Sequence, residues 1–296
     1  MIMKACVFHL QALTALHVGT GQGVGVVDLP IARSKATHLP IVPGSGIKAV
    51  MRDEFPMPEG YDGDFKKLQN TLFGPLSMEE TSFAGSLMFS DANLLILPIR
   101  SFAGTVAYAT CPFILKRYAR DVGITLPIVS LKGVEAAVTS QTVLEVSDRK
   151  IALEDLDIGS SYIDDTDHWA DAIAEMLYPE SVDNCESWRS AFTERFVILP
   201  DNIFSFLVDT ATEIRTRIRI DRKTRMVQKG ALWSEENLPA ESVLWGVLGV
   251  NKAFDKSGET AESLASYLPT TELHIQLGGK YTVGRGLCRL LINHKE

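Results

Sequence analysis

The chain has 296 residues, 46% of them hydrophobic, and its formal net charge at pH 7 is −8. This hydrophobic content supports a buried core, so the composition excludes a disordered or collagen-like chain. The acidic balance argues against a general nucleic-acid binder, because such proteins usually carry an excess of Lys and Arg. Any nucleic-acid surface must therefore be built locally.

The four cysteines are far apart in the sequence, at positions 6, 111, 185 and 288, and none forms a Cys-x-x-Cys pair. The pattern predicts neither a zinc site nor a thioredoxin-like motif and is typical of reduced thiols. The first residues lack the signal-peptide pattern, and no apolar run reaches the ~18 residues of a membrane span. We therefore expect a soluble, cytoplasmic protein that has no contact with a membrane.

The first predicted strand covers residues 4–12 and is followed by a glycine-rich loop at 19–25. A dinucleotide-binding fingerprint would need glycines that open a helix. Here the spacing differs, and Pro30 discourages a helix directly after Asp28. The sequence therefore excludes a Rossmann-type site at this loop.

A helix is predicted to begin at Ser45, a residue type that favours the N-cap position. Lys48 and Arg52 lie four residues apart and share one side of this helix, away from its apolar face. Free N–H groups at a helix start, together with two cations, suit a phosphate group.

The middle of the chain predicts a strand pair within 83–100 around Asp91 and a helix from Pro112 to near Gly123. Two acidic amphipathic helices are expected at 165–178 and 183–196, the second with Trp188 and Phe192 on its apolar face. We interpret residues 120–212 as an insertion within a single domain that spans residues 1–296.

Residues 213–221 alternate Arg215, Arg217 and Arg219 with β-branched residues, which predicts a strand with its three guanidinium groups on one face. Residues 215–229 contain seven cations and one acid. We therefore expect a cationic β-hairpin, residues 213–231, that projects from an acidic body.

A final strand pair, 273–277 and 287–292, is joined by the loop from Gly278 to Gly286. Gly279 and Gly284 have P-loop spacing, but Arg285 and Gly286 replace the required Lys and Ser or Thr, which excludes a Walker-type nucleotide site. The glycine backbones, with the charges of Lys280 and Arg285 beside them, can still bind phosphate, and the alternative is a tight turn.

Taken together, two glycine loops, a helix start and a cationic hairpin form a surface suited to an RNA backbone. The candidate RNA-binding residues are Ser45, Lys48, Arg52, Arg217, Arg219, Arg222, Arg225, Gly278, Gly279, Gly284, Arg285 and Gly286.

Motifs at 17–21, 27–33, 43–48, 97–104, 217–224, 230–239 and 278–286 match a known family in content and order. With them the chain resembles the RAMP superfamily of CRISPR proteins, and most of all the backbone subunits of type III-B (Cmr) effector complexes. Gly46 and Ala49 depart from the family's helix-start motif, and residues 120–212 carry no motif that we identify.

The resemblance implies an α+β, RRM/ferredoxin-like fold with a helical insertion and a projecting β-hairpin, the thumb. It implies copies stacked head to tail along a CRISPR guide RNA, together with other Cmr-type subunits. It further implies cleavage of complementary target RNA at regular intervals with a divalent metal, Mg²⁺ or Mn²⁺, by the aspartate that Asp28 matches.

By this resemblance Asp28 is the catalytic residue and the metal ligand, His17 and Glu235 or Glu236 lie near the same site, and His17 and Glu235 are the further catalytic candidates. RNA supplies its own nucleophile, the 2′-hydroxyl, so one carboxylate with a metal is sufficient chemistry, and His17 would assist proton transfer. The alternatives are that Asp28 caps a turn, that His17 is a hydrogen-bonded strand-end residue, and that Glu235 and Glu236 are solvated.

Other functions also fit these residues. Three alternatives are a guide-RNA-binding scaffold with an inert Asp28, the type III-A counterpart, and a metal-independent endoribonuclease that processes guide precursors. The hairpin arginines would alternatively pair with the acidic region 154–186 of a neighbouring copy.

Overall fold

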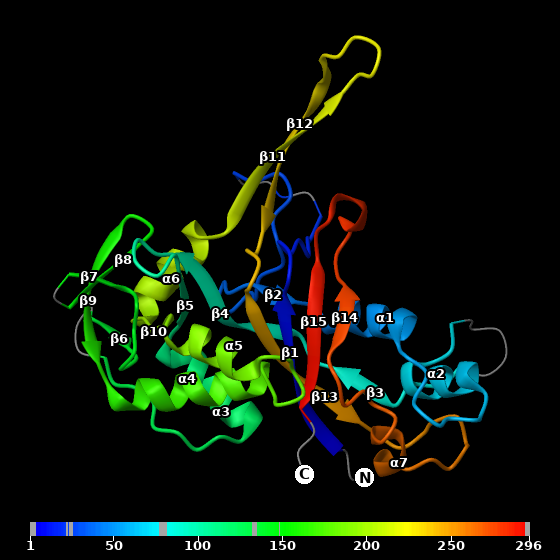
Figure 1. Ribbon diagram of the computed structural model, residues 1–296. Helices are drawn as coiled ribbons and strands as arrows, with labels where there is room; N and C mark the ends of the chain where they lie inside the picture. The colour runs from blue at the N-terminus through cyan, green and yellow to red at the C-terminus, as the bar shows by residue number, and fades with distance from the viewer. Residues whose placement is uncertain are drawn as a thin grey trace.

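A computed structural model describes residues 4–21, 23, 26–76, 82–131, 135–147 and 149–293. Residues 22, 24 and 25 of the predicted first glycine loop lie outside these ranges. Most strands join one 13-stranded sheet, and two form a separate ribbon that projects far from the body (Figure 1). The mixed α+β content agrees with the predicted fold class.

The centre of the sheet brings both ends of the chain together. Strand β1 (Lys4–Ala12) lies between β13 (Val243–Val250) and β15 (Leu287–Asn293) and is antiparallel to both, and β14 (Leu273–Gln276) pairs with β15. Residues 19–21 follow β1 and the loop 278–286 precedes β15, so this antiparallel pairing brings them to the same end of the sheet (Figure 1).

On the other side of β13 lies β4 (Ala92–Arg100), which also carries the short β2 (Ile41–Val42). Strand β3 (Leu87–Phe89) pairs with β13 and not with β4, so the predicted pairing around Asp91 was wrong. The reason lies at Ser90: its N–H donates to the carbonyl of Val247 of β13, and its hydroxyl accepts from the N–H of Val247. The surrounding helices are α1 (Gly44–Glu54), α2 (Phe65–Phe73) and α7 (Ala261–Ala265).

Region 120–212 is less helical than we expected. It contains α4 (Asp164–Leu177), α5 (Cys185–Thr193) and α6 (Asp201–Thr210), but also five strands: β6 (Ala136–Val138), β7 (Glu145–Ser147), β8 (Lys150–Leu153), β9 (Leu156–Tyr162) and β10 (Phe196–Ile198). These continue the main sheet from β4 through β5 (Val106–Thr110). Most have only three or four residues, too few for a recognisable alternation.

The helices of this half of the chain follow the sequence more closely. Helix α3 (Pro112–Val122) begins at Pro112 and ends at Gly123, which has a φ of 76°, as a helix-terminating glycine does. In α5, Phe192 is buried as predicted, whereas Trp188 is 53% exposed and stacks on Tyr178. The predicted apolar face of α5 is therefore only partly buried.

The ribbon is a hairpin of β11 (Glu213–Ile220) and β12 (Val227–Asn237), hereafter the thumb (Figure 1). Its second strand continues to Asn237, beyond residue 231 where we expected it to end. A register shift between Ile218 and Ile220 leaves Arg219 outside the regular pairing, so the arginine stripe is interrupted there. The lower part of β12, residues 233–237, is its root and reaches into the body.

His9 of β1 is fully buried in a polar pair within the core. Its Nδ1 donates to Oδ1 of Asn293 (2.7 Å), and its Nε2 accepts from the hydroxyl of Tyr118 (2.8 Å). Both contacts suit a neutral ring. Burial lowers the pKa of His9 to about 4, because the charged imidazolium loses its hydration there.

This histidine makes the fold sensitive to acid. Between pH 6.5 and 4 the unfolded chain binds a proton at His9 that the folded chain does not, so stability falls as pH falls. The expected loss is about 3 kcal/mol, complete below pH 4. Urea unfolding at a series of pH values should show this slope in the wild type and not in His9→Gln. The exposed-histidine variant His274→Gln should keep the slope, and an unchanged slope in His9→Gln would contradict the assignment.

Candidate functional site

The segment that carries Asp28 lies along the root of the thumb as an additional short strand. Leu29 pairs in parallel with Glu235 of β12. The N–H of Leu29 donates to the carbonyl of Ser234 (3.1 Å), and the N–H of Glu236 donates to the carbonyl of Leu29 (3.0 Å). Asp28 is thereby fixed to the thumb, although some 200 residues of sequence separate them.

The carboxylate of Asp28 is exposed, but Ser234 holds one of its oxygens. Oδ2 accepts from the N–H and from the hydroxyl of Ser234, each at 2.8 Å, and the Ser234 hydroxyl in turn accepts from the N–H of Asp28 (3.0 Å). These hydrogen bonds hold the pKa of Asp28 below its ordinary value, and the bond from the backbone N–H of Ser234 has the largest effect. The group is therefore an anion at neutral pH.

A surface cavity of about 480 Å³ brings Asp28 together with the thumb and the C-terminal glycine loop. Its lining comprises Asp28, Leu29, Arg219, Gly230, Leu232, Trp233 and Lys280. An anion, two cations and an indole thus share one hollow. This combination suits a nucleotide, whose phosphate pairs with cations and whose base stacks on an aromatic ring.

Glu235 is buried directly below this cavity lining and is not solvated, so that alternative was wrong. Its Oε1 accepts from Nζ of Lys280 (2.8 Å) and from Nε1 of Trp233 (2.7 Å), and Nε of Arg217 lies at 3.9 Å. Burial by itself raises the pKa of Glu235, but these donors and cations outweigh it and lower the pKa. Glu235 therefore fixes the orientations of Lys280 and Trp233.

His17 is 7% exposed, and its Nδ1 lies 2.6 Å from the carbonyl oxygen of Glu236. A carbonyl only accepts, so Nδ1 carries the proton and a neutral ring leaves Nε2 as the free acceptor. Nε2 faces the first glycine loop, since a Cβ added to Gly19 would lie 2.7 Å from it. This hydrogen bond fits the alternative that His17 is a hydrogen-bonded strand-end residue, and it also leaves Nε2 able to accept a proton.

The C-terminal glycine loop divides into packing positions and open positions. A Cβ on Gly278 would lie 2.2 Å from the carbonyl oxygen of His17, and one on Gly286 would lie 1.8 Å from that of Leu277. Both residues have positive φ, so only glycine fits. Gly279 and Gly284 face open space, which leaves their backbones accessible to a ligand.

Arg285 is buried at 5% exposure and donates from NH1 to Oδ1 of Asn237 (2.6 Å). Its guanidinium therefore fastens the glycine loop to the root of the thumb. Desolvation and the nearby Arg215 lower its pKa. The contact with RNA that we predicted for Arg285 stays a prediction, and the cation of this loop that reaches the cavity is Lys280.

The start of α1 differs from the prediction. Ser45 is not the N-cap: Pro43 occupies that position, and the N–H of Gly44 donates to Oδ1 of Asp91 (2.9 Å). A carboxylate from a distant turn thus replaces the local cap, which no pattern around Ser45 reveals.

The two cations of α1 have protein partners. Nζ of Lys48 donates to the carbonyl of Leu87 (2.8 Å), and Arg52 donates to Oδ1 of Asn70 (2.7 Å) and to the carbonyl of Gly74. These bonds hold α1 against β3 and α2. Their contact with RNA, like that of Ser45, stays a prediction, and none of the three lines the cavity at Asp28.

The tip of the thumb presents its cations to solvent. Asp221 shapes the turn, because its Oδ1 accepts from the N–H groups of Lys223 (2.8 Å) and Thr224 (2.9 Å). Arg222 and Arg225 are exposed on that turn, the latter with a φ of 60°. The thumb therefore combines free cations at its tip with the Asp28 segment at its root.

The model of the RAMP superfamily matches residues 9–289. The Cmr4 endoribonuclease of the CRISPR Cmr system of Pyrococcus furiosus is 30% identical over 303 residues, which covers 98% of this chain and 96% of that protein. This chain belongs to the RAMP superfamily and, within it, to the Cmr4 family. The resemblance inferred from the motifs is confirmed, and the full-length match favours type III-B over the type III-A counterpart.

Solved structures of Cmr4 proteins share the fold. The oligomeric Cmr4 of P. furiosus superposes with a TM-score of 0.73 at 25% identity and full coverage of both chains. A chain of the type III-B Cmr-beta complex bound to cognate target RNA gives a TM-score of 0.70 at 22% identity, with 98% of this chain and 97% of that chain covered. The second likeness concerns the RAMP fold alone.

Several residues that build this site were not predicted from the sequence. Ser234, Trp233 and Arg33 lie inside motifs that the resemblance used, yet nothing in those motifs indicates which partners they bond. Lys280 was noted only as a charge beside a glycine loop. Across the described ranges, no three His, Cys, Asp or Glu side chains gather as a metal site.

Proposed function

We infer that this chain is the repeated backbone subunit of a type III-B CRISPR effector complex. It binds guide RNA beside further copies of itself and other Cmr-type subunits, and it cuts target RNA that pairs with the guide. The single observation that carries this inference is the anionic Asp28 fixed at the root of a projecting cationic thumb. The P. furiosus relative, matched over 96% of its length, is named an endoribonuclease.

The site residues have different roles in RNA cleavage. The thumb and Lys280 hold the phosphate backbone in the cavity, which aligns a 2′-hydroxyl with the adjacent phosphorus. Nε2 of His17 accepts the proton of that hydroxyl as its oxygen attacks the phosphorus. The bond from phosphorus to the 5′-oxygen breaks, and the 5′-oxygen takes a proton from water, which leaves a 2′,3′-cyclic phosphate and a 5′-hydroxyl end. Glu235 keeps Lys280 and Trp233 in place beneath the nucleotide.

We propose that Asp28 holds a divalent ion, Mg²⁺ or Mn²⁺. One exposed, ionised carboxylate fits such an ion, because Mg²⁺ keeps several waters and takes further oxygen ligands from substrate phosphates. Ser234 engages Oδ2, which leaves Oδ1 for the ion. When bound, the ion would supply positive charge that offsets the negative charge of the phosphate oxygens.

We also propose a cytoplasmic location. The four cysteines are free thiols, which suits a reducing compartment. Within the described part of the chain, no helix has both the length and the apolar character to cross a membrane.

The complex assembled with guide RNA should cut a labelled complementary target at regular intervals, and EDTA should abolish the cutting. Added Mg²⁺ or Mn²⁺ should restore it, because Asp28 by itself offers too few ligands to retain the ion against a chelator. A non-complementary RNA of equal length is the control and should stay intact. Cleavage that survives EDTA, or cutting of the guide precursor in place of the target, would favour a guide-processing enzyme.

A further inference from the structure

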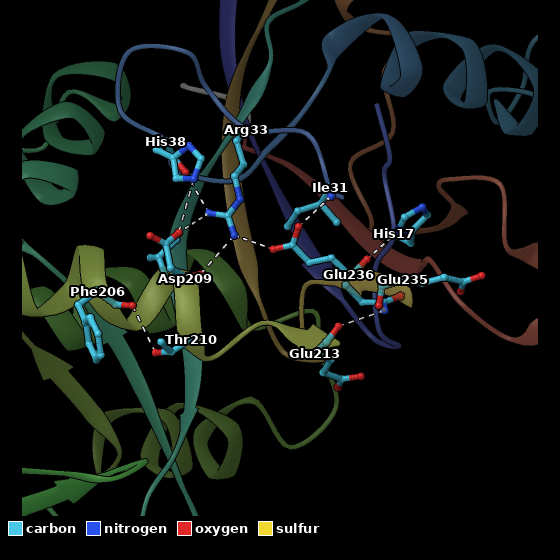
Figure 2. A network of polar contacts seen from close by, with 12 residues as sticks. His17, Ile31, Arg33, His38, Phe206, Asp209, Thr210, Glu213, Glu235 and Glu236 are labelled. Atoms are coloured by element: carbon cyan, nitrogen blue, oxygen red, sulfur yellow. Dashed lines mark hydrogen bonds and ion pairs between the residues drawn. The ribbon is translucent and has the colours of Figure 1, made fainter. Parts of the chain in front are cut away.

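Arg33, at the end of the Asp28 segment, is partly buried among three parts of the molecule, with its side chain 13% exposed (Figure 2). NH2 of Arg33 donates to Oε1 of Glu236 at the thumb root (2.7 Å), and NH1 donates to Oδ1 of Asp209 in α6 (3.2 Å). The carbonyl of His38 accepts a further bond at 3.0 Å. The guanidinium thus joins the loop, the helix that precedes the thumb, and the thumb itself.

Glu236 accepts two hydrogen bonds from the same segment. While Oε1 binds the guanidinium of Arg33, Oε2 accepts from the N–H of Ile31 (3.0 Å). Glu236 is only 6% exposed, and neither it nor Arg33 lines the cavity at Asp28. The pair therefore reaches the reacting atoms only through the chain that it holds.

Two adjacent contacts on β12 set the position of Asp28. Ser234 and Glu236 lie two residues apart on a strand, so their side chains share one face. Ser234 binds the carboxylate at the start of the segment, and Glu236 binds Ile31 and Arg33 at its end. The segment from Asp28 to Arg33 is therefore held at both ends by one strand of the thumb.

A buried ion pair is a weak source of stability, because the desolvation of both charges offsets their attraction. It does fix geometry, since the guanidinium and carboxylate meet only in a defined orientation. We propose that Arg33 and Glu236 are positioning residues for RNA cleavage, which set the place of Asp28 relative to RNA held by the thumb. This proposal rests on the proposed catalytic role of Asp28.

The test uses Arg33→Gln and Glu236→Gln in the assembled guide-loaded complex. Each removes one charge; Glu236→Gln keeps the side-chain size, whereas Arg33→Gln also shortens the side chain. Single-turnover cleavage of saturating target RNA should fall about 100-fold, the cost expected of a misplacement of about 1 Å. The Kd for target should stay within about twofold, because neither residue lies in the RNA cavity. The double variant should be no slower than the slower single variant, since the two residues act as a unit.

Asp209→Asn is the matched control. Asp209 also bonds Arg33 at the end of the Asp28 segment, but its side chain is 54% exposed, so solvent screens this ion pair. It should therefore cleave within about twofold of wild type.

Hydrogen exchange supplies a readout that is independent of activity. Amides of residues 29 and 31–33 should exchange faster in Arg33→Gln and Glu236→Gln, because the bond to the N–H of Ile31 weakens, while amides of β1 stay protected. Wild-type cleavage rates in both variants would overturn the proposal. So would equal losses of cleavage and target binding, or loss of β1 protection, since each indicates a general structural defect. Asp28→Asn assayed in parallel separates the proposals: if it cleaves normally, the proposed function itself fails.

Discussion

Asp28→Asn should lower target-RNA cleavage by about a thousandfold, a loss of ~4 kcal/mol of transition-state stabilisation. Asparagine keeps the shape, and its amide oxygen can still accept from the N–H and hydroxyl of Ser234, so the segment should stay on β12. What is lost is the negative charge, and with it the affinity for a divalent ion. The measurement is single-turnover cleavage by the assembled complex, with target binding measured separately.

Target binding should be unchanged in Asp28→Asn, because the cations of the thumb and the glycine loop remain. Asp155→Asn is the control for the removal of one surface carboxylate, since Asp155 is fully exposed on the turn between β8 and β9. Its cleavage should equal that of the wild type. Cleavage by Asp28→Asn at the wild-type rate would mean that the chain is a guide-RNA-binding scaffold and that another component cuts the target.

The sequence predicted this carboxylate through its motif but could not predict what holds it. Asp28 and Ser234 are 206 positions apart, and Arg33 and Glu236 are 203 apart. Contacts at that separation depend on how the whole chain packs, which local periodicity does not encode. The thumb was different: alternating arginines and β-branched residues form a local signal, and the hairpin begins at the predicted residue.

Lys48 and Arg52 show the same limit of prediction from sequence, because their partners lie far away in the chain. The spacing of Lys48 and Arg52 correctly placed them together on one helix, as helical geometry requires. Their partners, the carbonyl of Leu87 and the amide of Asn70, belong to other elements and engage charges that we had predicted for RNA. Sequence thus indicates which charges cluster, and only the fold indicates which of them face solvent.

Exposure identifies the thumb as one source of free positive charge on an acidic molecule. Arg219, Arg222 and Arg225 are exposed, whereas Arg217 lies within 3.9 Å of the buried Glu235. The first three can therefore be replaced without disturbing the carboxylates at the thumb root. They are also remote from the packed core, so their replacement should leave the free energy of unfolding nearly unchanged.

The triple variant Arg219→Ala, Arg222→Ala, Arg225→Ala should bind guide RNA on the order of 100-fold more weakly at moderate salt. Each lost charged contact with a phosphate costs roughly 1 kcal/mol or more. The slope of log K against log salt should also become shallower by about 2, since each contact with single-stranded RNA contributes about 0.7. Titrations of fluorescent guide RNA at several salt concentrations measure both quantities.

A charge-matched control is available on α2 and α3, where Lys66, Lys67 and Lys116 are exposed and belong to helices well removed from the thumb tip (Figure 1). Their replacement by alanine changes net charge equally but removes no predicted contact, so binding and its salt slope should stay close to wild type. If the two triple variants bind alike, the thumb does not grip RNA. If the thumb variant keeps RNA affinity but loses self-association, its arginines pair with the acidic residues 154–186 of a neighbouring copy.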